Sequence, residues 1–258
     1  MVLLIDIGNT HTHVAAVKNK NVIADVVIPS NTLTNGKARP ALAKLIRLTK
    51  CKTLSGAVFC SVVPRLNQSL KAMLREHWNC PTIQLTPKTV VGIGIDYPKP
   101  NSIGADRLAN SIAAHAKYGG PVIIVDFGTA VTFDIVDAAQ NYIGGIITPG
   151  LAVMTEYLHE KTALLPKIKI TEPSSVIGKN TQHAMLSGAV IGYRGLISEL
   201  LRQLKKELDV RKMAVIATGG YAKLIAKKIP SIQKVDPLLT IKGLRLVGKK
   251  HRPTWWQN

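Results

Sequence analysis

The feature that most restricts the fold of this chain is an internal repeat. An apolar run at 2–5 leads into Asp-Ile-Gly-Asn-Thr at 6–10, and a second run at 122–125 leads into Asp-Phe-Gly-Thr-Ala at 126–130. Each run has the pattern of a buried strand, followed by a tight glycine turn and a returning apolar strand. The two aspartates stand 120 positions apart in a chain of 258 residues. The repeating unit is therefore about half the protein, which predicts a duplicated fold.

The segments between and after the two turns have the pattern of α/β halves. Apolar residues recur at helical spacing in some of them and form β-branched runs in others. The expected helices lie at 41–48, 66–74, 196–208 and 221–228, and the expected strands lie at 55–63 and 212–218.

A Gly-Gly-Pro break at 119–121 marks the boundary between the halves, immediately before the second turn. We expect an N-terminal lobe at 1–118 and a C-terminal lobe at 119–248. The last ten residues, 249–258, are rich in basic side chains and are expected to form a flexible tail.

Composition and charge narrow the class of protein. Hydrophobic residues make up 46% of the chain and charged residues 19%, as in an ordinary globular enzyme. The formal net charge of +19 favours anionic partners: phosphorylated ligands, nucleic acid or an anionic membrane surface. The first residues carry no basic stretch before a long apolar run, and no segment approaches the ~18 apolar residues of a membrane span. This predicts a cytoplasmic protein that does not bind membranes. The three cysteines, an odd number without metal-site spacing, are interpreted as reduced thiols that pack as small hydrophobes.

The two glycine turns suit the binding of phosphate groups. A glycine lets backbone N–H groups approach an anion closely, and hydroxyl or amide side chains beside it add donors. The aspartate before each turn, Asp6 or Asp126, can hold a cation that shares the phosphate charge. A single Asp-Gly turn is usually just a hairpin, but two at matched positions predict a nucleotide gripped from both sides.

Two common nucleotide-binding motifs are absent. The segment 243–250 resembles a Walker A loop, but Lys250 stands where a serine or threonine should hold magnesium. Gly92 and Gly94 lack the third glycine of a dinucleotide fingerprint. Neither segment is interpreted as a nucleotide site.

A third constellation stands at 97–114, where prolines give way to Gly104 and then to an amphipathic helix beginning near Asp106. An acid in a first turn is often only a partner of the helix dipole. Asp106 beside Arg107 also suits a kinase acceptor site, because Arg107 can bind a carboxylate while Asp106 accepts a hydroxyl proton. Two weaker signals remain open between a ligand site and a helix entry: Thr-Gly-Gly at 218–220 and the segment 178–188.

Seven short motifs stand in order along the chain: Asp-x-Gly-Asn-Thr at 6–10, Gly-Ala-Asp-Arg at 104–107, Asp-Phe-Gly-Thr-Ala at 126–130, Gly-Gly-Ile-Ile-Thr-Pro-Gly at 144–150, Thr-Ala-x-Leu-Pro at 162–166, Gly-Lys-Asn-Thr at 178–181 and Thr-Gly-Gly at 218–220. In this order they resemble the type III pantothenate kinases over most of the chain. The resemblance implies a duplicated ribonuclease H-like fold of the actin-like ATPases, with two lobes around a nucleotide cleft, and ATP-dependent phosphorylation of pantothenate.

The resemblance also implies roles for individual residues. Asp106 would accept the proton, Asp6 would lie near Mg²⁺, and Asp126 would bind a monovalent cation, K⁺ or NH₄⁺. The family is dimeric, with the site near the subunit interface. The implied ATP-binding residues are Asp6, Ile7, Gly8, Asn9, Thr10, His11, Thr12, His13 and Thr129. The implied pantothenate-binding residues are Tyr97, Gly104, Ala105, Asp106, Arg107 and Thr181.

Two other functions remain as alternatives. One is a different actin-like phosphotransferase or phosphohydrolase that uses the same two turns. The other is a nucleic-acid-binding transcriptional regulator, which the net charge favours but no DNA- or RNA-binding motif supports.

Overall fold

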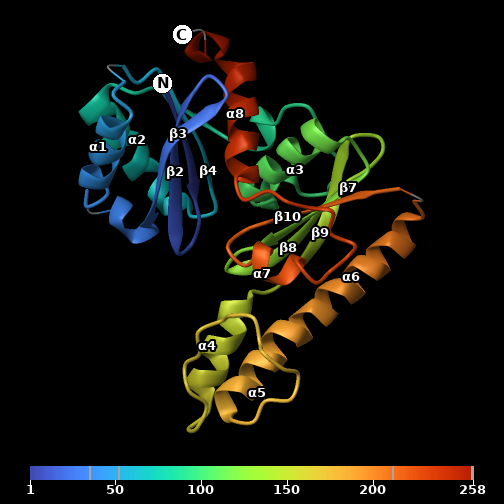
Figure 1. Ribbon diagram of the computed structural model, residues 1–258. Coiled ribbons are helices and arrows are strands. Elements are labelled where there is room, and N and C mark those ends of the chain that lie inside the picture. The colour runs from blue at the N-terminus through green and yellow to red at the C-terminus, as the bar shows by residue number, and fades with distance from the viewer. Residues whose placement is uncertain (35, 52, 211, 257–258) are drawn as a thin grey trace. The chain divides into compact units, whose positions relative to one another are not determined.

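The chain divides into two compact units in a computed structural model that describes residues 1–34, 36–51, 53–210 and 212–256 (Figure 1). The first unit contains Met1–Lys117 together with Leu238–Asn258, and the second contains Tyr118–Pro237. The chain therefore leaves the first unit at residue 118 and returns to it at residue 238.

The first unit is built on a five-stranded sheet of order β3-β2-β1-β4-β5. β1 pairs antiparallel with β2 and parallel with β4. The strands are β1 (Val2–Ile7), β2 (His11–Lys18), β3 (Asn21–Pro29), β4 (Gly56–Ser61) and β5 (Thr82–Gln84). The helices are α1 (Arg39–Leu48), α2 (Pro64–Trp78), α3 (Ala105–Tyr118) and α8 (Leu239–His251). The expected helices at 41–48 and 66–74 lie within α1 and α2, and the expected strand at 55–63 contains β4.

The second unit repeats this sheet as β9-β8-β7-β10-β11. Its strands are β7 (Val122–Phe127), β8 (Ala130–Val136), β9 (Asn141–Pro149), β10 (Ala214–Thr218) and β11 (Lys234–Val235). Its helices are α4 (Leu151–Lys161), α5 (Thr181–Ser187), α6 (Tyr193–Leu208) and α7 (Ala222–Ala226). The expected helix at 196–208 lies within α6, and the one expected at 221–228 is the shorter α7.

The duplication predicted from the two turns is confirmed in detail. β7 pairs antiparallel with β8 and parallel with β10, as β1 does with β2 and β4. β1 and β7 also have the same order of buried and partly exposed residues, with the aspartate as the partly exposed one. Even the irregularity in the next pairing recurs: it falls between Ala16 and Val17 in one sheet and between Ile135 and Val136 in the other. Both irregularities lie at the same register position relative to the first strand of their sheet, so the two sheets are built in the same way.

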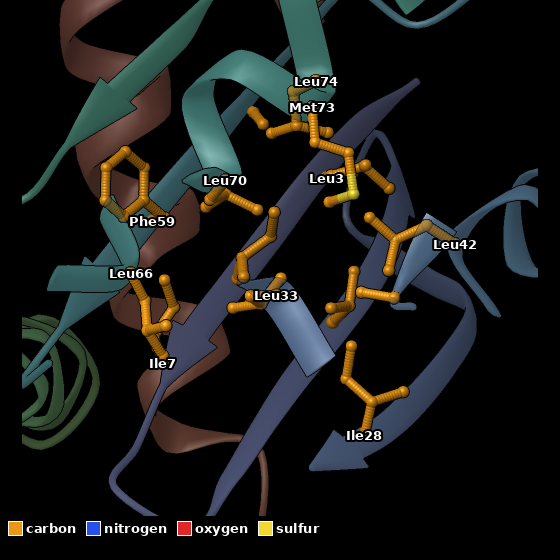
Figure 2. Packing of buried hydrophobic residues seen from close by; sticks show 14 of the residues in the cluster. Leu3, Ile7, Ile28, Leu33, Leu42, Phe59, Leu66, Leu70, Met73 and Leu74 are labelled. Carbon is orange, nitrogen blue, oxygen red and sulfur yellow. The ribbon is translucent and has the colours of Figure 1, made fainter. Parts of the chain in front are cut away.

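The core of the first unit shows how β1, which is apolar at every position except Asp6, buries one of its two faces. Leu3 and Ile7 project from one face of the sheet into a cluster with Leu42 of α1 and with Leu66 and Leu70 of α2 (Figure 2). All five side chains are buried. Burial of each contributes roughly 1.5–3 kcal/mol. The other face of β1, which carries Asp6, is thereby left for a different partner.

That partner is α8. It packs against β1 and β4, and a β-carbon at Gly248 would lie 2.7 Å from Val58 Cγ2 on the Asp6 face of the sheet. Beyond α8, a short 3₁₀ helix (Pro253–Trp256) places the ring of Trp255 directly over Gly56, where any larger side chain would collide with it.

The assignment of residues 238–248 to the C-terminal lobe was therefore wrong, because α8 buries its apolar side in the first unit. The expected flexible tail at 249–258 is also wrong for residues 249–256, which continue α8 and then form the 3₁₀ helix. Residues 257 and 258 lie outside the described part of the chain.

The second unit contains one continuous helix over Thr181–Leu208, formed by α5, a π-helical turn (Gly188–Gly192) and α6. By length and mean hydropathy alone this 28-residue helix could cross a membrane. That is weak evidence, because buried side chains such as Tyr193, Ile197 and Leu201 pack into the core of the unit, as in a soluble protein.

Candidate active site

The first glycine turn joins β1 to β2, and hydrogen bonds from Ser30 hold it in place. Gly8 N–H donates to the carbonyl of His11 at 3.0 Å, which closes the turn. Ser30 Oγ donates to the Gly8 carbonyl at 2.6 Å, and Ser30 N–H donates to the carbonyl of Thr10 at 3.0 Å. Ser30 Oγ also lies 2.9 Å from Thr12 Oγ1. This buried hydroxyl pair fixes the turn, a role for Ser30 that no sequence signal revealed.

The residues expected to bind ATP around this turn differ in what they present to solvent. Asn9, Thr10 and His11 are exposed, whereas the side chains of Ile7 and Thr12 are buried. His13 is paired with Asp25, its Nε2 lying 2.8 Å from Asp25 Oδ2. Any ligand contact by Ile7 or Thr12 is therefore limited to the backbone.

Asp6, the last residue but one of β1, lies beside this turn and has a strongly shifted pKa. Burial, followed by the negative charge of Asp106, raises the pKa of its carboxyl to about 7. The thiol of Cys60 works in the opposite direction by donating a hydrogen bond to Asp6 Oδ1 at 3.2 Å. Burial and the two carboxylates raise the pKa of the Cys60 thiol well above its usual value, so it remains a protonated donor.

Asp106 lies in the first turn of α3, directly after the tight entry at Gly104. A β-carbon at residue 104 would collide with Asp106 Oδ1, so only glycine leaves the carboxylate in place. Arg107 N–H donates to Asp106 Oδ1 at 2.8 Å. Burial raises the pKa of Asp106, although this bond and the Arg107 guanidinium partly offset the effect. In the motif Gly-Ala-Asp-Arg, the glycine thus leaves room for the Asp106 carboxylate and the arginine N–H binds it.

The structure brings Asp6 and Asp106 close enough to repel each other electrostatically. Two carboxylates that lie near each other in a partly buried place are stabilised when a proton or a cation offsets their repulsion. Mg²⁺ usually takes one or two carboxylates and completes its shell with water and substrate phosphates. Within the described residues no cluster of three or more acidic, histidine or cysteine side chains is present. Carboxylates so placed could hold a divalent cation whose other ligands are water and nucleotide phosphates.

The second glycine turn, between β7 and β8, is packed tightly by two further glycines. Gly150 N–H donates to the carbonyl of Thr129 at 3.0 Å, and a β-carbon at 150 would overlap that carbonyl. Gly219, with φ +91°, lies against Asp126 Oδ1 and the backbone of Phe127. The Thr-Gly-Gly motif at 218–220 therefore has a structural reason: the missing side chain at Gly219 allows the end of β10 to approach the Asp126 carboxylate closely.

The remaining predicted residues lie in loops and at a helix start. Tyr97 is exposed and precedes α3, and Thr181 is the exposed first residue of α5. Asn180 caps α5 by accepting from His183 N–H at 2.9 Å, while Gly178 packs against the backbone of Ala184. The motif at 178–181 thus builds a helix entry.

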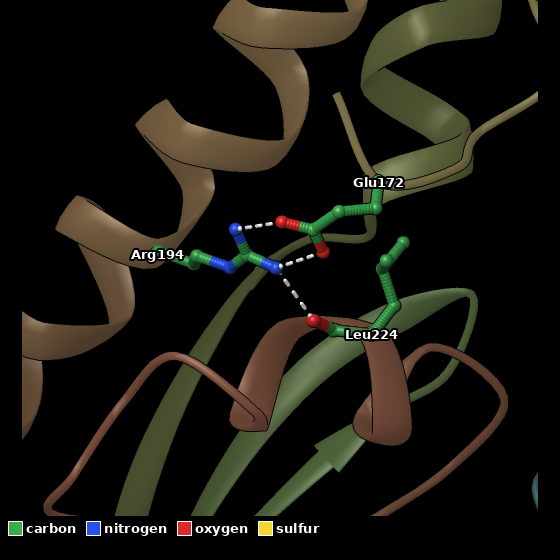
Figure 3. Close-up of polar contacts among 3 residues, drawn as sticks. All are labelled: Glu172, Arg194 and Leu224. Atoms are coloured by element: carbon green, nitrogen blue, oxygen red, sulfur yellow. Dashed lines mark hydrogen bonds and ion pairs between the residues drawn. The ribbon is translucent and has the colours of Figure 1, made fainter. Parts of the chain in front are cut away.

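The loop that leads to Thr181 is anchored by one arginine. Arg194 Nη1 and Nη2 donate to the two carboxylate oxygens of Glu172 at 2.9 and 2.6 Å, and Nη2 also donates to the Leu224 carbonyl at 2.8 Å (Figure 3). This fork ties the loop at residues 162–180 to α6 and α7. Asp126, Thr129 and Thr181 all belong to this second unit, whereas Asp6, Tyr97 and residues 104–107 belong to the first.

The duplicated sheets, each with an aspartate at the end of its first strand, define an actin-like kinase fold. A ROK family glucokinase from Streptomyces griseus is similar in structure, with TM-score 0.57 and 12% identity over 96% of this chain and 99% of that one. A Campylobacter jejuni protein described as belonging to the Baf family of transcriptional activators has TM-score 0.63 and 19% identity over 97% and 99% of the two chains. At such identities both likenesses show the fold alone.

Sequence comparison then identifies the family. The family model for type III pantothenate kinase matches residues 2–203. The type III pantothenate kinase of Akkermansia muciniphila is 46% identical over 95% of this chain and 97% of its own length. That of Exiguobacterium sibiricum is 38% identical over 98% and 100%. This chain belongs to the type III pantothenate kinase family.

Proposed function

We propose that this enzyme transfers the γ-phosphoryl group of ATP to the primary hydroxyl of pantothenate, giving 4′-phosphopantothenate and ADP in the first step of coenzyme A synthesis. The reaction follows from family membership. The observation that carries the assignment of the site is the pair of partly buried carboxylates, Asp6 and Asp106, of which the second raises the pKa of the first through its charge.

In this proposal Asp106 is the general base. Its raised pKa brings the carboxyl closer to the operating pH, where proton acceptance is most effective. Asp106 takes the hydroxyl proton of pantothenate, the hydroxyl oxygen forms a bond to the γ-phosphorus, and the bond from that phosphorus to the β–γ bridging oxygen breaks. ADP leaves with the electron pair of that bond. Because the transition state of phosphoryl transfer is loose, alignment and charge neutralisation supply most of the acceleration.

The cations have separate proposed sites. Asp6 holds Mg²⁺, which on binding neutralises charge on the phosphates of ATP. Asp126, at the equivalent strand end of the second unit, binds K⁺ or NH₄⁺. The exposed turn residues Asn9, Thr10 and Thr129 contact ATP. Pantothenate lies against Tyr97, Gly104, Ala105, Arg107 and Thr181, whose hydroxyl and guanidinium groups suit a ligand with hydroxyl, amide and carboxylate groups.

We also infer a homodimer, formed through the second unit. Exposed glycines recur along one face of the helix at 181–208, and around Gly188, Gly192 and Gly195 a β-carbon would meet nothing within 4 Å. A glycine within a helix costs ~1 kcal/mol relative to alanine, and nothing in the described part of this chain uses the space it leaves. Beside this glycine face, α4 exposes Tyr157 and Leu158. A second copy of the chain would cover both surfaces.

The protein is soluble, as expected of a metabolic enzyme of this family, and we place it in the cytoplasm. No nucleic acid is needed in this proposal, and the description of the Campylobacter jejuni relative stays with that protein.

One assay separates the proposed reaction from its alternatives. Purified protein is incubated with ATP, Mg²⁺ and K⁺, with and without pantothenate, and the products are identified by mass spectrometry. We expect 4′-phosphopantothenate and ADP in equal amounts, and little ADP when pantothenate is omitted. Equal ADP release with and without pantothenate would instead favour a phosphohydrolase. Absence of ADP release, together with salt-sensitive DNA binding, would favour a regulator.

A further inference from the structure

We propose that Cys60 is a positioning residue, which holds one carboxylate oxygen of Asp6 so that the other oxygen is presented to the cation and the phosphates. The inference rests on the proposed role of Asp6. Cys60 itself touches neither substrate nor metal in this proposal.

The contact is specific in its geometry. Cys60 is the fifth residue of β4, and Asp6 is the fifth residue of β1; the two are direct partners in the parallel pairing of these strands. Their side chains therefore leave the sheet on the same face, and Cys60 Sγ donates to Asp6 Oδ1 at 3.2 Å. Among the described residues, this thiol is the hydrogen-bond donor that reaches the Asp6 carboxylate.

The partner of Asp6 on the opposite side cannot replace Cys60. His13 pairs with Asp6 across β1 and β2, but its Nε2 lies 2.8 Å from Asp25 Oδ2. Without Cys60 the Asp6 carboxylate would have no donor from either neighbouring strand. It could then turn about its side-chain torsions, and its orientation toward a cation would no longer be fixed.

The second unit carries a small side chain with a polar hydrogen at the same register position. In the parallel pairing of β7 and β10, the residue opposite Asp126 is Thr218. Cys60 and Thr218 are both buried, and each has one polar hydrogen on a side chain of similar size. A small buried donor thus stands beside the strand-end aspartate in both halves of the duplicated chain. Chance packing of a cysteine gives no reason for this recurrence, whereas support of a ligand-bearing carboxylate does.

Groups that hold a metal ligand in place typically influence metal affinity or activity by ~10–100-fold. The matched variants are Cys60→Thr and Cys60→Val, which have the same shape and differ in whether residue 60 can donate a hydrogen bond. We expect Cys60→Val to need about tenfold more Mg²⁺ for half-maximal rate, and Cys60→Thr to stay within about threefold of the parent protein.

A second readout does not depend on turnover. The rise in Tm on adding Mg²⁺ with ADP should be smaller in Cys60→Val than in Cys60→Thr. Cys80→Ala is the control, because Cys80 is also buried in the first unit but lies in the apolar cluster away from Asp6. It should lose some stability and keep the parent response to Mg²⁺. If neither larger residue folds, Cys60→Ser and Cys60→Ala provide the same comparison.

The outcomes separate this inference from the function beneath it. Equal Mg²⁺ curves and equal Tm responses for the Thr and Val variants would overturn the role of Cys60. Asp6→Asn tests the underlying assignment: loss of the Mg²⁺ response in that variant, with equal Thr and Val variants, rejects only the role of Cys60. An unchanged Mg²⁺ response in Asp6→Asn rejects the role of Asp6 and that of Cys60 with it.

Discussion

Gly243 of α8 lies directly against the backbone of Ala109 of α3, so that a β-carbon at position 243 would overlap the Ala109 carbonyl oxygen. Beside this contact, Thr240 Oγ1 donates to Asn110 Oδ1 at 2.8 Å. Ala109 stands one helical turn after Asp106. The approach of the two helices therefore fixes the start of α3, and with it the position of the proposed base.

Replacing Gly243 with alanine should consequently harm both stability and catalysis. The extra methyl must push α8 away from α3, which we expect to cost roughly 1–3 kcal/mol of unfolding free energy. We also expect kcat to fall, because the displaced α3 misplaces Asp106 relative to Asp6. Urea denaturation and steady-state kinetics measure the two effects. Lys250→Ala, on the exposed side of the same helix, should change neither.

Asp106→Asn should lower kcat by more than tenfold and leave ATP binding largely intact, because the amide keeps the size of the carboxyl but accepts no proton. General-base catalysis is typically worth ~10²–10⁴-fold. Calorimetric titration with a non-hydrolysable ATP analogue checks binding while turnover is followed separately. Glu207→Gln, which alters an exposed carboxylate in α6, is the control. A variant with the parent rate would remove Asp106 from the mechanism.

The pH dependence of stability should carry the signature of Asp6. Its folded-state pKa of about 7 lies above the ordinary value of 3.8, so the folded protein binds this proton more tightly than the unfolded chain. The contribution of Asp6 to unfolding free energy is therefore present at low pH and is lost as pH rises from about 4 to about 7.

Mg²⁺ should restore the stability that is lost when Asp6 ionises, because Mg²⁺ binds the charged carboxylates. We expect Mg²⁺ to raise Tm more at pH 8 than at pH 5.5 in thermal denaturation. Asp6→Asn should be more stable than the parent protein at pH 8 without Mg²⁺, and should lose most of the Mg²⁺ effect. An equal Mg²⁺ effect at both pH values would show that the cation binds elsewhere.

The glycine face of the long helix gives a test of the dimer. Gly192→Leu places a side chain in open space within the described chain, so each copy should fold normally. A second copy could no longer approach that face. We expect light scattering after size exclusion to report a monomer for this variant and a dimer for the parent protein. Lys206→Leu, at an exposed position further along α6, should remain dimeric.

Much of the fold could be predicted because its signals are local. The strand, glycine turn and returning strand recur within a few residues, and the apolar runs of β1 and β7, each interrupted by one aspartate, predict their burial directly. The placement of α8 could not be predicted, because an amphipathic helix at 239–251 packs equally well on either sheet as far as its own pattern shows. The contact between its Gly243 and Ala109 is visible only once both helices are placed.

The same limit applies to the site. Asp6 and Asp106 each stand in a recognisable motif, but their proximity joins residues 100 positions apart and needs the tertiary fold. Cys60 had no motif at all. Its importance comes from strand register, which is set by the pairing of β1 with β4 and not by any residue next to it in the chain.

The return of α8 to the first unit also has a consequence for how the protein is made. Synthesis proceeds from the N-terminus, and domains usually fold as they leave the ribosome. Here the sheet that carries Asp6 emerges first, yet the helix that covers that face is translated only after the whole second unit. The first unit can therefore complete its fold only after the whole second unit has been synthesised. A chain that stopped at residue 237 would have a complete second unit and an incomplete first one, whose uncovered apolar sheet proteases could attack.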